Sequence, residues 1–198
     1  MKKKKLFKNK TQMFIYTLTF IICIILFIVI GKTDFQKDID TEAEKFSSLY
    51  NLVEDNNLYH FSNANEILTV LNGRSGVILL GFPLNEWTNY YADILDEVAK
   101  ELNVDKIYYY DFLKDREESN GTYETIVNKL NVYVTVDDEG RKDLHAPTVI
   151  IVKKGEIIGY FDETSSIKGS VTPEIYYTEY QKGITYEGFK TALIEYMK

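Results

Sequence analysis

The sequence predicts an α/β domain that follows one apolar segment near the N-terminus. Patterns typical of strands and of helices alternate between residues 58 and 111. Residues 76–82 are apolar without alternation, which is typical of a strand buried on both faces. A turn at residues 153–155 joins two further apolar stretches with the spacing of a β-hairpin. This order favours a mixed central sheet with parallel central strands and right-handed crossovers, flanked by helices.

The individual elements follow from periodicity and from capping residues. The expected elements are strands at 58–61, 76–82, 104–111, 148–152 and 156–161, and helices at 64–71, 84–102, near 123–130 and at 186–197. Asn63 and Glu66 have the spacing of a capping box at the start of the first helix. Residues 162–182 are rich in Ser, Thr, Gly and Tyr, so we expect a loop there.

The N-terminal segment has the length and charge of a membrane anchor. Six lysines precede it, at positions 2, 3, 4, 5, 8 and 10. Residues 13–30 then carry no charge, and their 18 positions reach ~27 Å as a helix, close to the thickness of a bilayer core. We therefore expect a transmembrane helix at 13–31, a basic cytoplasmic tail at 1–12, and an extracellular C-terminal domain.

Two other interpretations of this segment are weaker. A cleaved signal peptide has a shorter apolar core and small residues at its exit, and the run Val29-Ile30-Gly31 is a poor version of that exit. A lipoprotein signal would use Cys23, but the preceding residue is Ile22 rather than a small one. We therefore expect that the apolar segment is retained as a membrane anchor.

The charge and the cysteine content limit the functions that the part of the chain after residue 31 can have. All 30 acidic residues but only 17 of the 23 basic residues lie after residue 31, which gives a net charge of −13 there and argues against nucleic acid as a partner. The single cysteine, Cys23, lies in the apolar segment. His60 and His145 are the only histidines, so we expect no metal site and no cofactor. We assign residues 32–57 to a juxtamembrane linker or helix and 58–198 to the domain.

Five motifs follow one another along the chain. They are Gly81-Phe82-Pro83 before a turn, Trp87 inside it, the helical stretch 94–99, the strand 106–111, and Ala146-Pro147-Thr148-Val149 before the hairpin. With these motifs in this order, the chain resembles thioredoxin-fold proteins over roughly residues 58–197. The chain is similar in particular to membrane-anchored or secreted thioredoxin-like proteins of Gram-positive bacteria, some of which are described as bacteriocin-transport accessory proteins.

The resemblance also shows what the chain lacks. Redox-active members carry Cys-Pro-Trp-Cys where this chain has Asn85-Glu86-Trp87-Thr88. Thiol–disulfide exchange needs a thiolate and a second sulfur, so we expect no oxidoreductase activity. Glu86 could serve Thr88 as a base, but a solvated carboxylate at a positive helix end is the better interpretation.

The other half of the family's site is present. The resemblance implies that Pro147 is cis and faces the turn, where the backbone of Ala146 pairs with an extended peptide beside Trp87. The alternative is inherited geometry without a ligand. The candidate partner-binding residues are Asn85, Glu86, Trp87, Thr88, Ala146 and Pro147.

Three functions remain open on the sequence alone. The first is a redox-inactive accessory module that binds a protein outside the cell. The second is a structural subunit of a membrane complex with a vestigial groove, and the third is a redox role through a partner's cysteines.

Two further groups of residues each allow a structural interpretation and a functional one. We expect packing roles, rather than an adhesive aromatic face, for Tyr90, Tyr91, Tyr108, Tyr109, Tyr110, Tyr176, Tyr177 and Tyr180. Asp137, Asp138, Glu139 and Asp143 do not match a calcium-binding loop, so we expect a solvated turn. We expect His145, close to the presumed groove, to be exposed.

Overall fold

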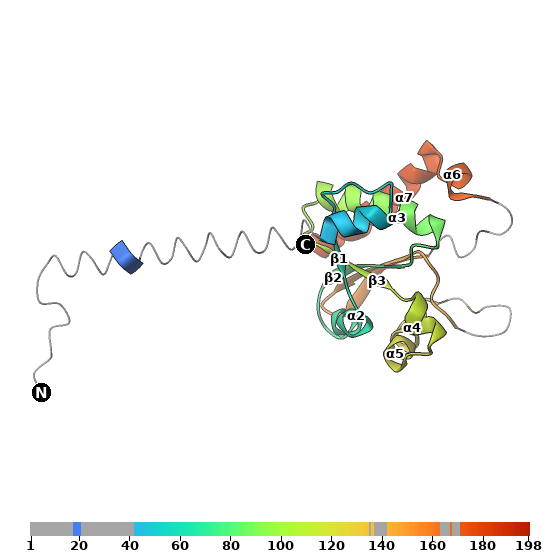
Figure 1. The fold of residues 1–198 in the computed structure, drawn as a ribbon, viewed down its shortest axis with the longest axis horizontal. Helices are drawn as coiled ribbons and strands as arrows, with labels where there is room; N and C mark the ends of the chain where they lie inside the picture. Colours follow the sequence, from blue (N-terminus) through green and yellow to red (C-terminus); the bar gives the residue numbers. More distant parts are fainter. Residues whose placement is uncertain (1–17, 21–41, 135, 137–141, 163–166, 168–170) are drawn as a thin grey trace, which may run out of the picture. The chain divides into compact units, whose positions relative to one another are not determined.

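The computed structural model describes residues 18–20, 42–134, 136, 142–162, 167 and 171–198 (Figure 1). Residues 1–41 and 42–198 form two separate units. The expected transmembrane segment lies outside the described residues, except for a short helical stretch at its centre. Within the described ranges no helix is both long and apolar enough to cross a membrane.

Among the residues described, five strands form one mixed sheet. They are β1 (Tyr59–Phe61), β2 (Gly76–Gly81), β3 (Ile107–Asp111), β4 (Thr148–Lys153) and β5 (Glu156–Phe161). The strand order is β1-β3-β2-β4-β5. β3 pairs in parallel with both β1 and β2, whereas β4 pairs antiparallel with β2 and β5 pairs antiparallel with β4. The mixed α/β architecture predicted from the sequence, with its parallel central strands and its hairpin, is confirmed.

Helices cover both faces of this sheet. They are a helix at 42–49, α2 (Ala64–Leu71), α3 (Glu86–Glu101), α4 (Leu113–Glu117), α5 (Gly121–Lys129), α6 (Pro173–Tyr176) and α7 (Glu179–Met197). The helix at 42–49, α3 and α7 lie on one face, and α2, α4 and α5 lie on the other (Figure 1).

The central strand β2 is buried on both faces because its alternate side chains enter two different cores. Val77 and Leu79 pack with residues of α3 and α7. Ile78 and Leu80 point the other way and pack with residues of α2 and α5. All four side chains are fully buried, as the unbroken apolar pattern predicts.

The helix at 42–49 belongs to the folded unit. Phe46 on its inner side and Tyr50, which directly follows the helix, are buried in the same core as residues of α3. The Phe46 ring stacks on Tyr59 with 3.8 Å between ring centroids, and the Tyr50 and Tyr109 hydroxyls lie 2.7 Å apart. The compact unit therefore starts at Glu42 and takes in part of the stretch 32–57 that we assigned to a juxtamembrane linker or helix, of which 42–49 is helical.

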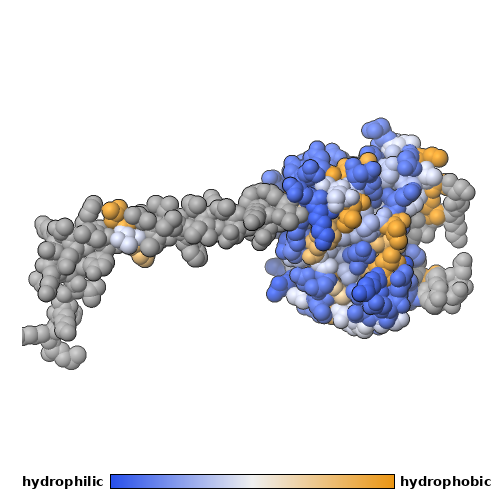
Figure 2. Space-filling model, in the orientation of Figure 1, coloured by the Kyte–Doolittle hydropathy of each residue, from blue (hydrophilic) through white to orange (hydrophobic). Residues whose placement is uncertain are grey.

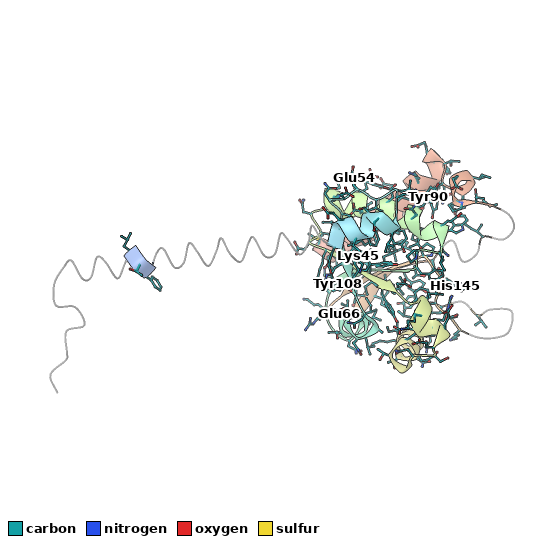
Figure 3. All side chains as sticks on the ribbon, in the orientation of Figure 1. Lys45, Glu54, Glu66, Tyr90, Tyr108 and His145 are labelled. Atoms are coloured by element: carbon teal, nitrogen blue, oxygen red, sulfur yellow. The ribbon has the colours of Figure 1, made fainter. Side chains whose placement is uncertain are left out.

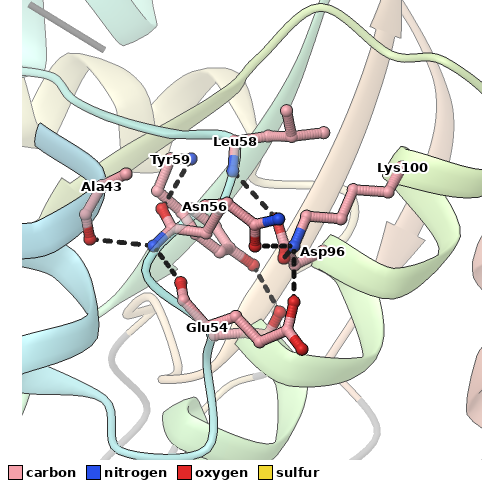
Figure 4. Close-up of polar contacts among 9 residues, drawn as sticks. Ala43, Glu54, Asn56, Leu58, Tyr59, Asp96 and Lys100 are labelled. Carbon is pink, nitrogen blue, oxygen red and sulfur yellow. Dashed lines mark hydrogen bonds and ion pairs between the residues drawn. The ribbon is translucent and has the colours of Figure 1, made fainter. Parts of the chain in front are cut away.

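The buried carboxylate of Asp96 on α3 binds the segment that follows the helix at 42–49 (Figure 4). Asp96, only 4% exposed, accepts a hydrogen bond from the Leu58 N–H at 2.9 Å. Its other oxygen lies 2.8 Å from the Lys100 ammonium, which also donates to Asn56 at 2.9 Å. Burial raises the pKa of the Asp96 carboxyl, and its contacts with Lys100 and the Leu58 N–H oppose that rise.

The sequence predicted some helix ends correctly and others incorrectly. The capping box is confirmed, because the Asn63 side chain accepts from the Glu66 N–H and the Glu66 carboxylate accepts from the Asn63 N–H. α3 begins at Glu86 rather than at residue 84. The loop expected at 162–182 is wrong for α6 and for the first turn of α7. α4 was not predicted.

Candidate functional site

A tight turn connects β2 to α3. The Asn85 N–H donates to the Phe82 carbonyl at 3.0 Å, which closes the turn around Pro83 and leaves Leu84 83% exposed. Asn85 is then the N-cap of α3, and its side-chain oxygen accepts from the Thr88 N–H at 3.2 Å. The Asn85–Thr88 stretch therefore lies where free N–H groups give the helix a positive end.

The second part of the site is the loop before β4. The Ala146–Pro147 peptide bond is cis, as the resemblance implied. Pro147 is buried and Ala146 is partly exposed. The Thr148 hydroxyl donates to the His145 carbonyl at 2.7 Å, which ties the loop to the start of β4.

The side chain of Asn85 joins these two parts. Its amide nitrogen donates to the Ala146 carbonyl at 2.8 Å. One neutral side chain thus caps a helix with its oxygen and holds the cis-proline loop with its nitrogen. The sequence placed both segments in one site, and the structure brings them into contact.

Thr88 is turned away from this surface. Its side chain is fully buried, and its hydroxyl points to the Asn85 side-chain oxygen at 3.4 Å. Gly81 faces it so closely that a Cβ at position 81 would lie 2.5 Å from the Thr88 methyl group. Glu86 is exposed. This geometry does not place Glu86 as a base on a Thr88 nucleophile.

Trp87 packs against a helix that the sequence pattern did not predict. Its ring lies 5.3 Å from that of Tyr176 and 5.9 Å from that of Tyr177, both at the end of α6. Tyr90, one turn further along α3, stacks on Tyr177 at 5.2 Å. α6 thus supplies aromatic neighbours to the candidate site, and Trp87 itself remains partly exposed.

Two exposed carboxylates lie close to this aromatic group. Burial raises the pKa of Tyr90, and the charges of Glu174 and Glu86 raise it further, so both carboxylates act on the same hydroxyl. Hydrogen bonds from its own backbone N–H, from Thr172 and from Tyr90 lower the pKa of Glu174. In the described part of the chain, neither carboxylate pairs with a lysine or an arginine.

The remaining predicted residues fall mostly into structural roles. Tyr91, Tyr109, Tyr110 and Tyr177 are buried, as expected for packing residues, whereas Tyr180 is 79% exposed. The described ranges hold no group of three His, Cys, Asp or Glu side chains that could bind a metal.

The acidic turn and His145 are the last candidates that the sequence raised. Asp137, Asp138 and Glu139 lie outside the described residues. Asp143 accepts a short hydrogen bond from the Tyr123 hydroxyl. His145 is partly buried rather than exposed.

The fold and the site define a mixed α/β domain in which a cis-proline loop contacts the N-cap of the helix after the central strand. No family model matches the chain, and no curated protein is significantly similar to it.

Proposed function

We propose that the chain is a thioredoxin-like protein without thiol–disulfide chemistry that binds a segment of another protein at the outer face of a cell membrane. The basic tail and the apolar segment 13–31 support a single-pass anchor with a cytoplasmic N-terminus. The partner contacts Asn85, Glu86 and Trp87 of the turn and Ala146 of the cis-proline loop, whereas Thr88 and Pro147, which are buried, support this surface from below.

The contact between Asn85 and Ala146 carries this proposal. It keeps a cis-proline backbone beside the start of α3, where an extended segment could pair with it. Ala146 is partly exposed, and among the described residues none accepts a hydrogen bond from its N–H. That N–H is the backbone donor for an added strand.

The absence of cysteine supports a binding role over a redox role. Residues 32–198 contain no cysteine, so this part of the chain offers neither an attacking thiolate nor a resolving thiol. The helix end that would lower a thiol pKa is occupied by Asn85, which is neutral and already hydrogen bonded.

Site-specific photocrosslinking in native membranes tests the proposal. A photoreactive residue at exposed position 86 should capture a partner protein. The same residue at exposed position 129, at the end of α5 on the other face of the sheet, should not. Capture only from 129 would contradict the proposal and support a structural subunit that docks through α5. No capture from either position would also contradict it.

Substitutions at the groove give a second test. Trp87→Lys or Ala146→Trp should weaken capture of the partner, because the first removes the aromatic ring and adds a positive charge and the second blocks the proposed contact surface. Circular dichroism and thermal unfolding should show that each variant remains folded. Unchanged capture by both folded variants would place the partner on another face.

A further inference from the structure

The end of the site formed by α3 and α6 combines aromatic rings with carboxylates. We call it the acidic aromatic corner and define it as Glu86, Trp87, Tyr90, Glu174 and Tyr176. Tyr90 is labelled in Figure 3 on the α6 side of the folded unit. The Tyr90 hydroxyl hydrogen bonds with Glu174, Glu86 lies one turn before Tyr90 on α3, and the Trp87 and Tyr176 rings meet edge to face.

Exposed apolar side chains flank this corner. Leu84 in the turn before α3 is 83% exposed, and Ile175 on α6 is 67% exposed. Figure 2 shows such hydrophobic side chains on a largely hydrophilic surface of the folded unit. A single exposed apolar side chain is common on any protein surface, so Leu84 and Ile175 support a contact surface only together with the aromatic rings of the corner.

We propose that the acidic aromatic corner binds a lysine or arginine side chain of an extended partner segment, whose neighbouring apolar side chains lie on Leu84 and Ile175. This inference rests on the proposed function and specifies the chemistry of its partner.

Charge complementarity favours a basic occupant. Glu86 and Glu174 are exposed and have no basic partner in the described ranges, so a cation arriving there meets two unneutralised charges. The rings of Trp87, Tyr90 and Tyr176 add a second attraction, because the face of an aromatic ring is negative and draws cations. An acidic segment would be repelled by the same groups.

The corner is also ordered before anything binds. The Glu174 carboxylate is held by Thr172 and Tyr90, and Tyr90 is held in turn by its stack on Tyr177. Groups that are already in place lose less conformational freedom on binding, which favours affinity. A partner segment without a positive charge would leave both carboxylates without an ion pair.

Peptide binding to the full chain in detergent micelles tests the inference. Trp87 is the only tryptophan, so its fluorescence reports on this site alone. The probes are three short peptides with identical apolar flanks and a central Lys, Gln or Glu. The Lys peptide should bind about 5- to 10-fold more tightly than the Gln peptide, and added salt should reduce that ratio. The Glu peptide should bind most weakly.

Variants in which neutral amides replace the carboxylates show which residues cause the preference for the Lys peptide. Glu86→Gln with Glu174→Gln should reduce the ratio between Lys and Gln peptides to about 2-fold or less, because both carboxylates are then lost. Glu97→Gln is the matched control, since Glu97 is an exposed carboxylate further along α3. It removes one charge and should leave the ratio unchanged.

The outcomes separate this inference from the proposed function. Equal binding of the Lys and Gln peptides overturns the basic specificity but leaves a binding module in place. The same decrease in Glu97→Gln as in the double variant also overturns it, because the effect is then one of net charge. If none of the peptides binds, the inference fails, and crosslinking from position 86 decides the proposed function independently.

Discussion

The two ends of α3 are held in opposite ways. Residues 42–58 contact α3 from Asn89 to Lys100 and pack with it and with β1 and β3 in one core, and we call this region the docked end. There the contacts are buried, with Phe46 under aromatic neighbours and Asp96 between Leu58 and Lys100. At the N-terminal end of α3, which we call the turn end, one amide contact from Asn85 holds the cis-proline loop, and Leu84 and Glu86 beside it are exposed.

This difference shows how one helix can serve both stability and contact. The docked end buries apolar area and satisfies a buried charge, so it contributes most to the free energy of folding. The turn end needs only enough contacts to keep its backbone in position. Side chains there can change with little loss of stability, which leaves them free to serve binding.

The largest expected effect is at the docked end. Phe46→Ala should lower the free energy of unfolding by about 3–5 kcal/mol, because it leaves a cavity among stacked rings. Chemical denaturation measures this loss. Leu49→Ala on the same helix is the control, since Leu49 is 43% exposed, and it should cost less than about 1 kcal/mol. Similar small losses in both variants would mean that residues 42–49 are not part of the folding unit.

Removal of the buried carboxylate should come next. Asp96→Ala should cost about 2–4 kcal/mol, because the Leu58 N–H loses its acceptor and the Lys100 ammonium loses its closest partner. Asp96→Asn keeps an acceptor for Leu58 and should recover part of the loss. Equal losses in the two variants, compared by urea denaturation, would assign the whole effect to Lys100.

Alkaline pH should also weaken the docked end. Burial raises the pKa values of Tyr50, Tyr59 and Tyr109 above the ordinary 10.0. Above pH 10 the unfolded chain therefore loses protons that the folded chain retains. The stabilisation is complete below that pH and falls as the pH rises, by up to about 1.4 kcal/mol per pH unit for each group.

Denaturation midpoints measured across this range check the alkaline effect. Tyr50→Phe should make the decline with pH shallower, because one titrating group is gone. Tyr180→Phe, at a side chain that is 79% exposed, should not change the slope. A flat profile in the unmodified protein would contradict the burial of these hydroxyls.

A smaller effect is expected at the turn end. Asn85→Ala removes both the helix cap and the hydrogen bond to Ala146 and should cost about 1–2 kcal/mol. Asn85→Ser keeps an oxygen for the cap but cannot donate to Ala146 in the same way. If Asn85→Ser retains full partner capture, the contact between the two segments does not organise the site.

A gain in chemistry, at a stability cost like that of Asn85→Ala, should come from cysteines introduced at positions 85 and 88, because the helix cap and the bond to Ala146 are lost here too. Asn85→Cys with Thr88→Cys should give measurable disulfide reductase activity, because a thiol at position 85 would sit at the positive end of α3. The unmodified protein should show none, and turnover by it would contradict the proposed function. Asn85→Ser with Thr88→Ser is the thiol-free control.

The elements that could be predicted from the sequence are those that one local rule decides. The apolar run of β2, the capping box at Asn63 and the turn of the hairpin each predicted an element that the structure contains. The two halves of the candidate site were paired not by a local rule but through the family resemblance, whose motifs include Gly81-Phe82-Pro83 and Ala146-Pro147.

Two of the missed elements, α6 and the first turn of α7, lacked an apolar stripe but carried helix-start signals, whereas α4 has no side-chain cap. α6 begins with Thr172-Pro173, and proline is favoured at the first position of a helix. Thr178 caps α7 three residues before Gln181, which is capping-box spacing. The contact of α6 with Trp87, and that of Asn85 with Ala146, depend on tertiary packing that no local pattern encodes.

The close approach of Gly81 to Thr88 has a consequence for how this turn can vary. A methyl group at position 81 would collide with the Thr88 methyl group, so alanine at 81 requires a smaller residue at 88. The Thr88 hydroxyl oxygen would also lie only 2.9 Å from a Cβ at position 81, so serine at 88 does not relieve the collision. The two positions form an epistatic pair: a mutational library should recover alanine at 81 only together with a residue as small as alanine at 88.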